Sequence, residues 1–247
     1  GDTALTESYN GSNWTEVNDM NTARNSSAGC GTQTAALSFG GFQDPSTRLN
    51  NTEKWNGTCW TELNNLNTAR KQLAGTGTNT SALAFAGELA PGSPGNSALT
   101  ETWNGTCWSE GNDLNTARRD VGAAGVVTSA LCFGGTPNLT VTEKYNGTNW
   151  TEVNDFNTGR SNMGGAGADN TAVLAFGGSA PNTGKTELWN GVNWAEQNDL
   201  SVARNTLGGS GTTTNAIAAG GGADSGKTAA TEEWSTSSKV IDTITTS

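Results

Sequence analysis

Short apolar alternations that end in small residues, usually glycine, are the most regular pattern along this chain. A leucine and a phenylalanine lie two positions apart, and small residues occupy the positions between and before them. Side chains two positions apart point to the same face of a β-strand, so the large residues share one face and the small residues the other. The pattern predicts one short strand that packs on its large face in each copy. The copies are ALSF (36–39), ALAF (82–85), ALCF (130–133), VLAF (173–176) and the weaker AIAA (216–219).

A second pattern divides the chain into repeats. Each repeat carries Thr-Glu, then an aromatic residue followed by Asn-Gly, then a Trp five positions after the aromatic residue and an Arg ten positions after that Trp. The first aromatic residues are 46, 48, 42 and 44 residues apart. This regularity defines five repeats of about 45 residues, and a partial sixth copy, TEEW, begins at Thr231.

Each repeat predicts four antiparallel strands: one after the Arg, one that ends at the glycines, one at Thr-Glu-aromatic and one at the second Trp. Asn-Gly between the last two is typical of a two-residue type I′ hairpin turn, in which both central residues have positive φ. Four strands in about 45 residues correspond to one propeller blade. We therefore expect an all-β fold, a single five-bladed or alternatively six-bladed β-propeller over residues 1–247. Residues 226–247 are expected to supply a partial sixth repeat and a C-terminal strand or tail, and the copy at either end could complete the last blade.

The double glycine, the Glu-x-aromatic-Asn strand, the Trp and the following Arg resemble the kelch repeat over nearly the whole chain. Segments such as YNGTNWTEVNDFNTGR (145–160) and TAALSFGG (34–41) are most similar to the divergent kelch-like repeats of structural and tail-associated proteins of marine bacteriophages. The resemblance implies a kelch-like propeller and a place in a virion or an extracellular assembly.

Residues that recur in every repeat are expected to hold the blades together, because only one copy could serve a single active site. The second tryptophans are expected to pack between blades, and the arginines to bind a repeated glutamate or main-chain carbonyls. These structural residues are Trp14, Trp60, Trp108, Trp150 and Trp194; Arg24, Arg70, Arg118, Arg160 and Arg204; and Glu7, Glu53, Glu101, Glu143 and Glu187. An Asp that recurs before the Arg is expected to cap a turn, since one carboxylate per loop lacks the ligand density of a calcium site.

Composition argues against most catalytic and metal sites. The chain has no His, which excludes Ser-His-Asp triads and Cys-His pairs, and its four Cys form no CxxC pair. We expect four free thiols, no metal and no cofactor, and we interpret the protein as a non-enzyme. A pair of loop carboxylates of the glycosidase type remains open. The net charge of −10 opposes nucleic-acid binding, and no apolar run approaches the length of a transmembrane helix, so membrane insertion is not expected.

Binding is expected in the loops that differ most between repeats, which follow the glycine-ended strands. The candidate binding residues are Phe42, Asp44, Arg48, Glu88, Pro91, Pro94, Asn96, Asn182 and Lys185. The leading hypothesis is a structural or adhesive module of a phage virion (tail, fibre or capsid decoration) or of an extracellular assembly. Its partners would be other proteins of that assembly, copies of itself included. The alternative is a lectin-like propeller that binds glycans through exposed tryptophans, and a glycosidase ranks third.

Overall fold

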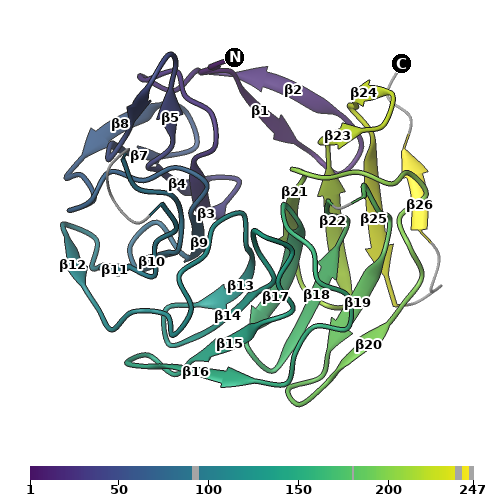
Figure 1. The fold of residues 1–247 in the computed structure, drawn as a ribbon. Coiled ribbons are helices and arrows are strands. Elements are labelled where there is room, and N and C mark those ends of the chain that lie inside the picture. Colours follow the sequence, from purple (N-terminus) through teal and green to yellow (C-terminus); the bar gives the residue numbers. More distant parts are fainter. Residues whose placement is uncertain (91–94, 180, 237–240, 245–247) are drawn as a thin grey trace. The chain divides into compact units, whose positions relative to one another are not determined.

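The computed structural model describes residues 1–90, 95–179, 181–236 and 241–244. Every regular element among these residues is a β-strand (Figure 1). The described part of the chain contains no helix of the length and apolarity needed to cross a lipid bilayer. The strands fall into two compact units, Gly1–Arg119 and Asp120–Ser247, and each is described by itself.

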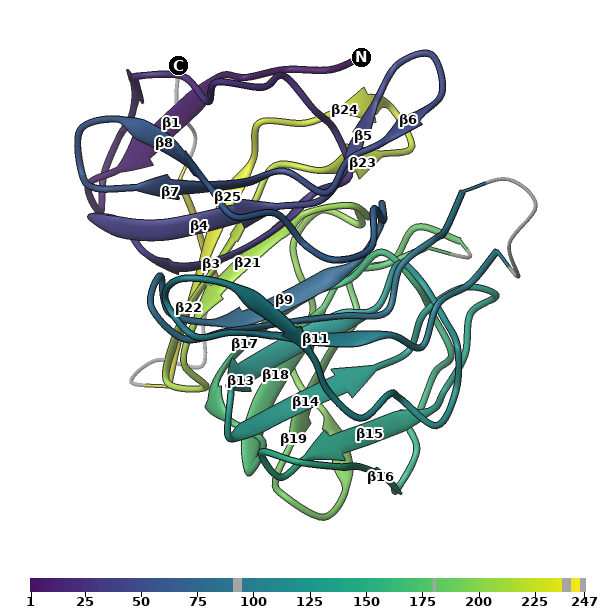
Figure 2. The ribbon, with the colours of Figure 1, turned by 90° about the vertical axis from the view of Figure 1, so that its left-hand side faces the viewer.

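The first unit holds two four-stranded antiparallel sheets and two short hairpins (Figure 2). One hairpin, β5–β6, extends beyond the first four-stranded sheet, and the other, β1–β2, forms a two-stranded sheet of its own. The hairpins are β1 (Thr6–Tyr9) with β2 (Trp14–Val17), and β5 (Phe42–Gln43) with β6 (Thr47–Arg48). The sheets are β3 (Ala28–Thr32), β4 (Ala35–Phe39), β7 (Thr52–Trp55) and β8 (Trp60–Leu63), then β9 (Ala74–Gly77), β10 (Ala82–Phe85), β11 (Thr100–Trp103) and β12 (Trp108–Glu110).

The second unit holds three four-stranded antiparallel sheets and one short hairpin, β23–β24 (Figure 1). The first two sheets are β13 (Gly122–Val126), β14 (Ser129–Phe133), β15 (Thr142–Tyr145) and β16 (Trp150–Val153), then β17 (Gly164–Asp169), β18 (Ala172–Phe176), β19 (Thr186–Trp189) and β20 (Trp194–Glu196). The third is β21 (Gly208–Gly211), β22 (Asn215–Ala219), β25 (Thr231–Ser235) and β26 (Ile241–Ile244), with β23 (Gly222–Ala223) and β24 (Gly226–Lys227) between β22 and β25.

Alternation of large and small residues fits one sheet onto the next. In the first unit, Leu37 and Phe39 of β4 share a buried cluster with Ala82 and Ala84 of β10, so the large face of one sheet packs on the small face of its neighbour. Glycine completes this fit, because a Cβ at Gly75 would lie 2.4 Å from the Phe39 ring. The second unit repeats the arrangement, with Leu174 and Phe176 against Ala216 and Ala218. The predicted strand is therefore buried on both faces, not only on its large one.

The Asn-Gly turns differ from the prediction. The aromatic residue of one strand pairs directly with the Trp of the next, as Trp55 does with Trp60, so the connecting loop has four residues. Gly57 has a φ of 94°, whereas Asn56 is not in the positive-φ region. The Asn56 side-chain oxygen instead accepts the N–H groups of Thr58 and Cys59, both at 2.9 Å. Asn is required here as a side-chain acceptor that replaces a backbone turn, so the type I′ assignment was wrong.

The C-terminal copy of the repeat completes the last sheet. Strand β22 pairs with β25, in the register Ala216 to Trp234 and Ala219 to Thr231. The N-terminal copy, β1–β2, remains a separate two-stranded sheet. Both segments carry the same sequence pattern, so the choice between them could not be made from the repeat alone.

Candidate binding site

A buried Arg–Glu pair ties four of the four-stranded sheets to the segment that precedes them in the sequence. Arg70 donates to Glu101 at 2.9 Å and to the carbonyl oxygens of Ala86 and Leu99 at 3.1 and 2.7 Å. Both side chains are almost fully buried. Burial lowers the pKa of Arg70, and the Glu101 charge opposes that shift. A buried guanidinium held by a carboxylate and two carbonyl oxygens fixes the segment that leads into the loop.

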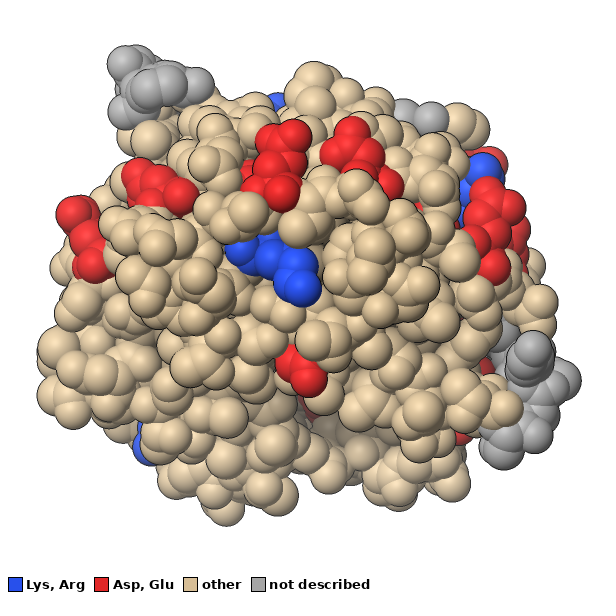
Figure 3. Space-filling model, turned by 90° about the horizontal axis from the view of Figure 1, so that it is seen from below, with Lys and Arg blue, Asp and Glu red and all other residues tan. Residues whose placement is uncertain are grey.

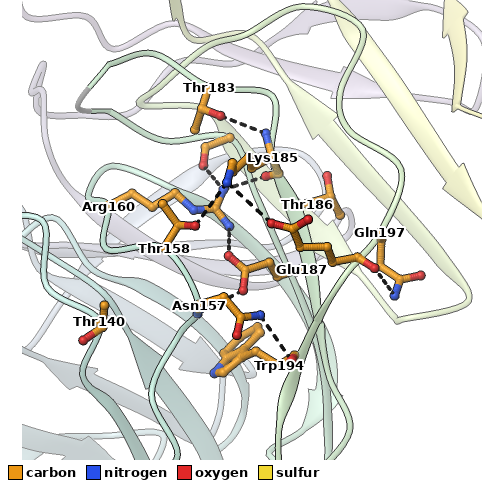
Figure 4. A network of polar contacts seen from close by, with 12 residues as sticks. Thr140, Asn157, Thr158, Arg160, Thr183, Lys185, Thr186, Glu187, Trp194 and Gln197 are labelled. Carbon is orange, nitrogen blue, oxygen red and sulfur yellow. Dashed lines mark hydrogen bonds and ion pairs between the residues drawn. The ribbon is translucent and has the colours of Figure 1, made fainter.

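The same tie in the second unit is formed by Arg160 and Glu187, which lie 2.8 Å apart (Figure 4). Asn157 connects it to the next strand, since its backbone N–H donates to Glu187 and its side chain to the Trp194 carbonyl. Arg24 with Glu53 and Arg204 with Glu232 form the corresponding pairs. Glu7 departs from its expected structural role, because it is exposed and its carboxylate forms no ion pair with a described arginine.

We call the buried Arg–Glu ties the frame. In the loops of the first unit, side chains from three consecutive repeats converge on Glu88. The backbones of Lys71 and Glu88 form an antiparallel bridge, and a second bridge joins Glu88 to Asn96. A Cβ at Gly87, whose φ is 109°, would lie 2.9 Å from the Lys71 carbonyl oxygen, so glycine permits this close approach. Arg119 follows the buried Arg118 of the next repeat. We call Phe42, Arg48, Lys71, Glu88, Asn96 and Arg119 the charged loop cluster.

Three cations share the single carboxylate of this cluster. Arg48 forms an ion pair and a hydrogen bond with Glu88 Oε1, and Lys71 Nζ lies 3.4 Å from the same oxygen. Arg119 Nε lies 3.4 Å from Oε2, and its Nη1 donates to Asn96 Oδ1 at 2.8 Å. The ring of Phe42 adds a cation–π contact, with its centre 4.7 Å from Lys71 Nζ.

The cluster is cationic in an anionic protein. Three positive groups surround one carboxylate in a chain of net charge −10. The side chains are partly accessible: 11% exposed for Arg48, 17% for Glu88, 22% for Lys71 and 30% for Arg119. Partial burial opposes ionisation of Glu88, but the Arg48 hydrogen bond and the Lys71 and Arg119 charges outweigh it, so the pKa of Glu88 is lowered. On the face in Figure 3, acidic side chains lie among uncharged residues, with a basic side chain near the centre of the view.

The structure brings together some of the candidate binding residues and separates others. Phe42, Arg48, Glu88 and Asn96 belong to the charged loop cluster. The backbone N–H of Asp44 donates to Asp2 Oδ2 at 2.8 Å. Pro91 and Pro94 lie outside the described residues.

In the second unit, Asn182 donates to Asp224 Oδ1 at 2.7 Å and accepts from Asn205. Lys185 Nζ lies 3.5 Å from Glu196 Oε1 and 3.2 Å from Thr158 Oγ1. Sequence reasoning missed Lys71 and Arg119. Their position in the repeat could have indicated them, because each directly follows a repeated Arg and so begins the same loop segment in its repeat.

The tryptophans give little room for sugar pockets. Trp108, Trp150 and Trp194 are only 5 to 6% exposed, and the Trp108 indole N–H donates to Thr52 of the preceding sheet at 2.9 Å. Its ring lies 4.9 Å from that of Phe39. Trp14 and Trp60 are half-buried, so they are the copies that a glycan could reach.

Carboxylate pairs do occur, but they recur with the repeat. Glu101 faces Glu110 across two strands, and Glu187 faces Glu196 in the same register. The inner glutamate of each pair is bound to the buried Arg, so it is not available as an acid or a nucleophile. Among the described residues, no group of His, Cys, Asp and Glu could hold a metal ion, and all four cysteines are free.

Comparison with known proteins identifies the fold and not the activity. No protein-family model matches the sequence, and no curated protein matches it. The solved structure of YjhT is similar in fold, with a TM-score of 0.78 at 12% sequence identity over 97% of this chain and 91% of that one. The four-stranded sheets are the blades of a five-bladed β-propeller, which confirms the fold class expected from the repeats.

Proposed function

We propose that this chain is a non-enzymatic binding module whose charged loop cluster holds an acidic group of a neighbouring protein. The observation that carries the proposal is the convergence of Arg48, Lys71 and Arg119 on one carboxylate in an otherwise acidic chain. Such a concentration of like charge is unfavourable unless an anion compensates it. Glu88 compensates one of the three positive charges, and an incoming carboxylate would compensate another.

The chemistry of the cluster favours a carboxylate over other anions. Glu88 already shows which group the cations accept, with one oxygen facing Arg48 and Lys71 and the other facing Arg119. Guanidinium groups bind carboxylates through paired N–H donors, which gives both affinity and orientation.

The proposed role is structural or adhesive. Buried Arg–Glu ties fix the positions from which the loops depart, and binding residues on loops need such a rigid base. The resemblance of the repeats to those of phage structural proteins supports a place in a virion or an extracellular assembly. In that setting the acidic group belongs to another protein of the assembly. A second copy of this chain, which is itself acidic, could supply it. A glycan that carries a carboxylate shares the chemistry, and half-buried Trp14 and Trp60 favour it as the second candidate.

The experiment is a binding titration of the full chain at low ionic strength with three probes: a short oligoglutamate peptide, a galacturonate oligosaccharide and a neutral glucan. The variant Arg48→Gln/Arg119→Gln removes two cations of the cluster. The control, Lys54→Gln/Lys227→Gln, removes the same charge elsewhere in the chain. We expect the cluster variant to bind the peptide about tenfold more weakly, a loss of ~1.4 kcal/mol, and the control to bind it almost normally.

Each probe decides between the candidates. Binding of the oligoglutamate peptide alone supports a protein partner. Stronger binding of the galacturonate oligosaccharide would favour an acidic glycan as the ligand instead. Equal losses in the two variants would show only diffuse attraction to charge, and the site would be abandoned. Turnover of any glycan would overturn the non-enzymatic assignment.

A further inference from the structure

The two-stranded sheet β1–β2 has the sequence of half a blade, and no further strand of the described residues joins it. In the four-stranded sheets, the Thr-Glu-x-aromatic strand lies between the Trp strand and the glycine-ended apolar strand. β7, for example, pairs with β8 on one side and with β4 on the other. β1 pairs with β2 in the same register, from Thr6–Val17 to Tyr9–Trp14, but no described strand pairs with its other edge. An open edge of this kind is a template for another strand.

A second observation on the same strand concerns Glu7. In the complete sheets its counterparts Glu53, Glu101, Glu187 and Glu232 are at most 1% exposed, and each is paired with an arginine. In each complete sheet, that arginine lies directly before the first two strands of the sheet, which are the two strands that β1–β2 does not have. Glu7 is exposed and has no partner among the described residues. The described residues therefore supply neither the arginine nor the strand that the other copies have at this position.

Apolar surface beside this edge is also uncovered. Leu5, directly before β1, is 61% exposed, whereas its counterpart Leu99 is half-buried. Thr6 is half-buried, whereas Thr52 and Thr142 are fully buried. The backbone edge of β1, the carboxylate of Glu7 and the side chain of Leu5 thus all lack the cover that their counterparts have.

We infer that β1–β2 is an acceptor for a two-stranded hairpin of this same repeat type. The hairpin brings an arginine that pairs with Glu7 and an apolar strand that pairs with β1. The known sheets fix the register: Phe176 pairs with Thr186 and Val173 with Trp189, so the incoming phenylalanine lies opposite Thr6 and the residue three before it opposite Tyr9. Strand addition supplies main-chain hydrogen bonds, and the buried ion pair makes the site selective for the repeat sequence.

This acceptor differs from the charged loop cluster in residues and in ligand. It takes a strand with an arginine, not a carboxylate, and it uses no residue of the cluster. It therefore stands or fails independently of the proposed function.

The test adds a synthetic peptide of residues 157–178, which spans Arg160, β17 and β18 and contains no cysteine, to the full chain. Binding is followed by titration and by hydrogen exchange of the amides of Thr6–Tyr9. A second version carries the peptide on a flexible linker at the N-terminus of the chain, which raises its effective concentration and offsets the cost of ordering it. We expect binding, slower exchange in β1 and a higher unfolding temperature in the linked form.

Two substitutions test the predicted contact. Glu7→Gln in the protein, or Arg160→Gln in the peptide, should weaken binding about tenfold or more, because each leaves a buried charge without its partner. The matched control is Glu16→Gln, which changes the exposed glutamate directly opposite Glu7 on β2 and should leave binding unchanged. Equal binding by the Glu7→Gln and Glu16→Gln proteins would overturn the inference. So would unchanged exchange in β1 with both the free and the linked peptide.

Discussion

The bridge between Lys71 and Glu88 in the first unit has a counterpart in the second, between Ser161 and Ser179. Both join the residue after a buried arginine to the residue after the double-glycine position, and Gly87 and Gly178 have φ values of 109° and 123°. The side chains differ completely. Lys71 and Glu88 belong to a cluster of four charged groups, whereas the hydroxyls of Ser161 and Ser179 lie 3.0 Å apart and Asn138 accepts from Ser161.

The comparison shows that frame and binding surface are encoded separately. Sheet packing, the Arg–Glu tie and the backbone bridge are the same in both units, which indicates that the fold requires them. Charge at the bridge is present in one unit and replaced by neutral polar groups in the other, so folding does not require it. A cationic cluster that the frame does not need is the more informative sign of binding.

Breaking the shared frame should produce the largest effect and should act equally on both units. Glu101→Ala and Glu187→Ala each leave a buried guanidinium without its carboxylate, so we expect each to lower the free energy of unfolding by about 3–5 kcal/mol. Urea unfolding measures this. The controls Glu110→Ala and Glu196→Ala, on the exposed partners across the strand pair, should cost under about 1 kcal/mol. A small effect in one unit alone would mean that the two ties are not equivalent.

Removing the Glu88 carboxylate should increase the affinity for an acidic peptide, whereas a substitution at the matched position of the second unit should not. Glu88→Gln frees three cations from their own counter-charge, so oligoglutamate should bind about tenfold more tightly, which corresponds to ~1.4 kcal/mol. Ser179→Ala, at the matched position of the second unit, should leave that affinity unchanged. Weaker binding by Glu88→Gln would show that Glu88 positions the arginines and is not a stand-in for the ligand.

Low pH should produce a smaller difference between the two bridges, in the effect of their substitutions on the free energy of unfolding. The pKa of Glu88 is lowered from its ordinary value of 4.5 in the folded protein, so its contribution to stability is complete above that value and is lost as pH falls through the lowered one. The difference in unfolding free energy between the wild type and Glu88→Gln should therefore be constant near neutral pH and shrink below about pH 4.5. Ser179→Ala should show no such dependence. Unfolding curves measured across this range would contradict the assignment if the two variants behaved alike.

Thiol labelling should distinguish the units without affecting stability. Cys59 and Cys107 in the first unit are exposed turn residues, while Cys132 in the second is buried. Burial raises the pKa of Cys30 to about 12, which keeps that thiol protonated and unreactive. We expect two rapidly labelled cysteines in the native protein, both in the first unit, as determined by mass spectrometry. Rapid labelling of Cys132 would indicate that its sheet opens.

Much of the fold could be predicted because its contacts follow the repeat. The alternation of Leu37 and Phe39 with small residues predicted a packed strand, and the structure adds that Ala82 and Ala84 of the next sheet receive it. The type I′ turn was wrong, because Asn56 acts through its side chain and not through its backbone conformation. Of the cluster, Phe42, Arg48, Glu88 and Asn96 were expected in loops, but Lys71 and Arg119 were not.

The sequence by itself determined the repeat length, the strands and the residues shared by every repeat, because fixed spacing places like residues at like positions. Tertiary structure alone decided that β25 and not β1 completes the last sheet, that Glu7 is left without an arginine, and that Arg48, Lys71 and Arg119 meet at Glu88. These outcomes join residues from different repeats through long side chains and unequal loops. Their positions depend on how neighbouring blades pack, which no local pattern records.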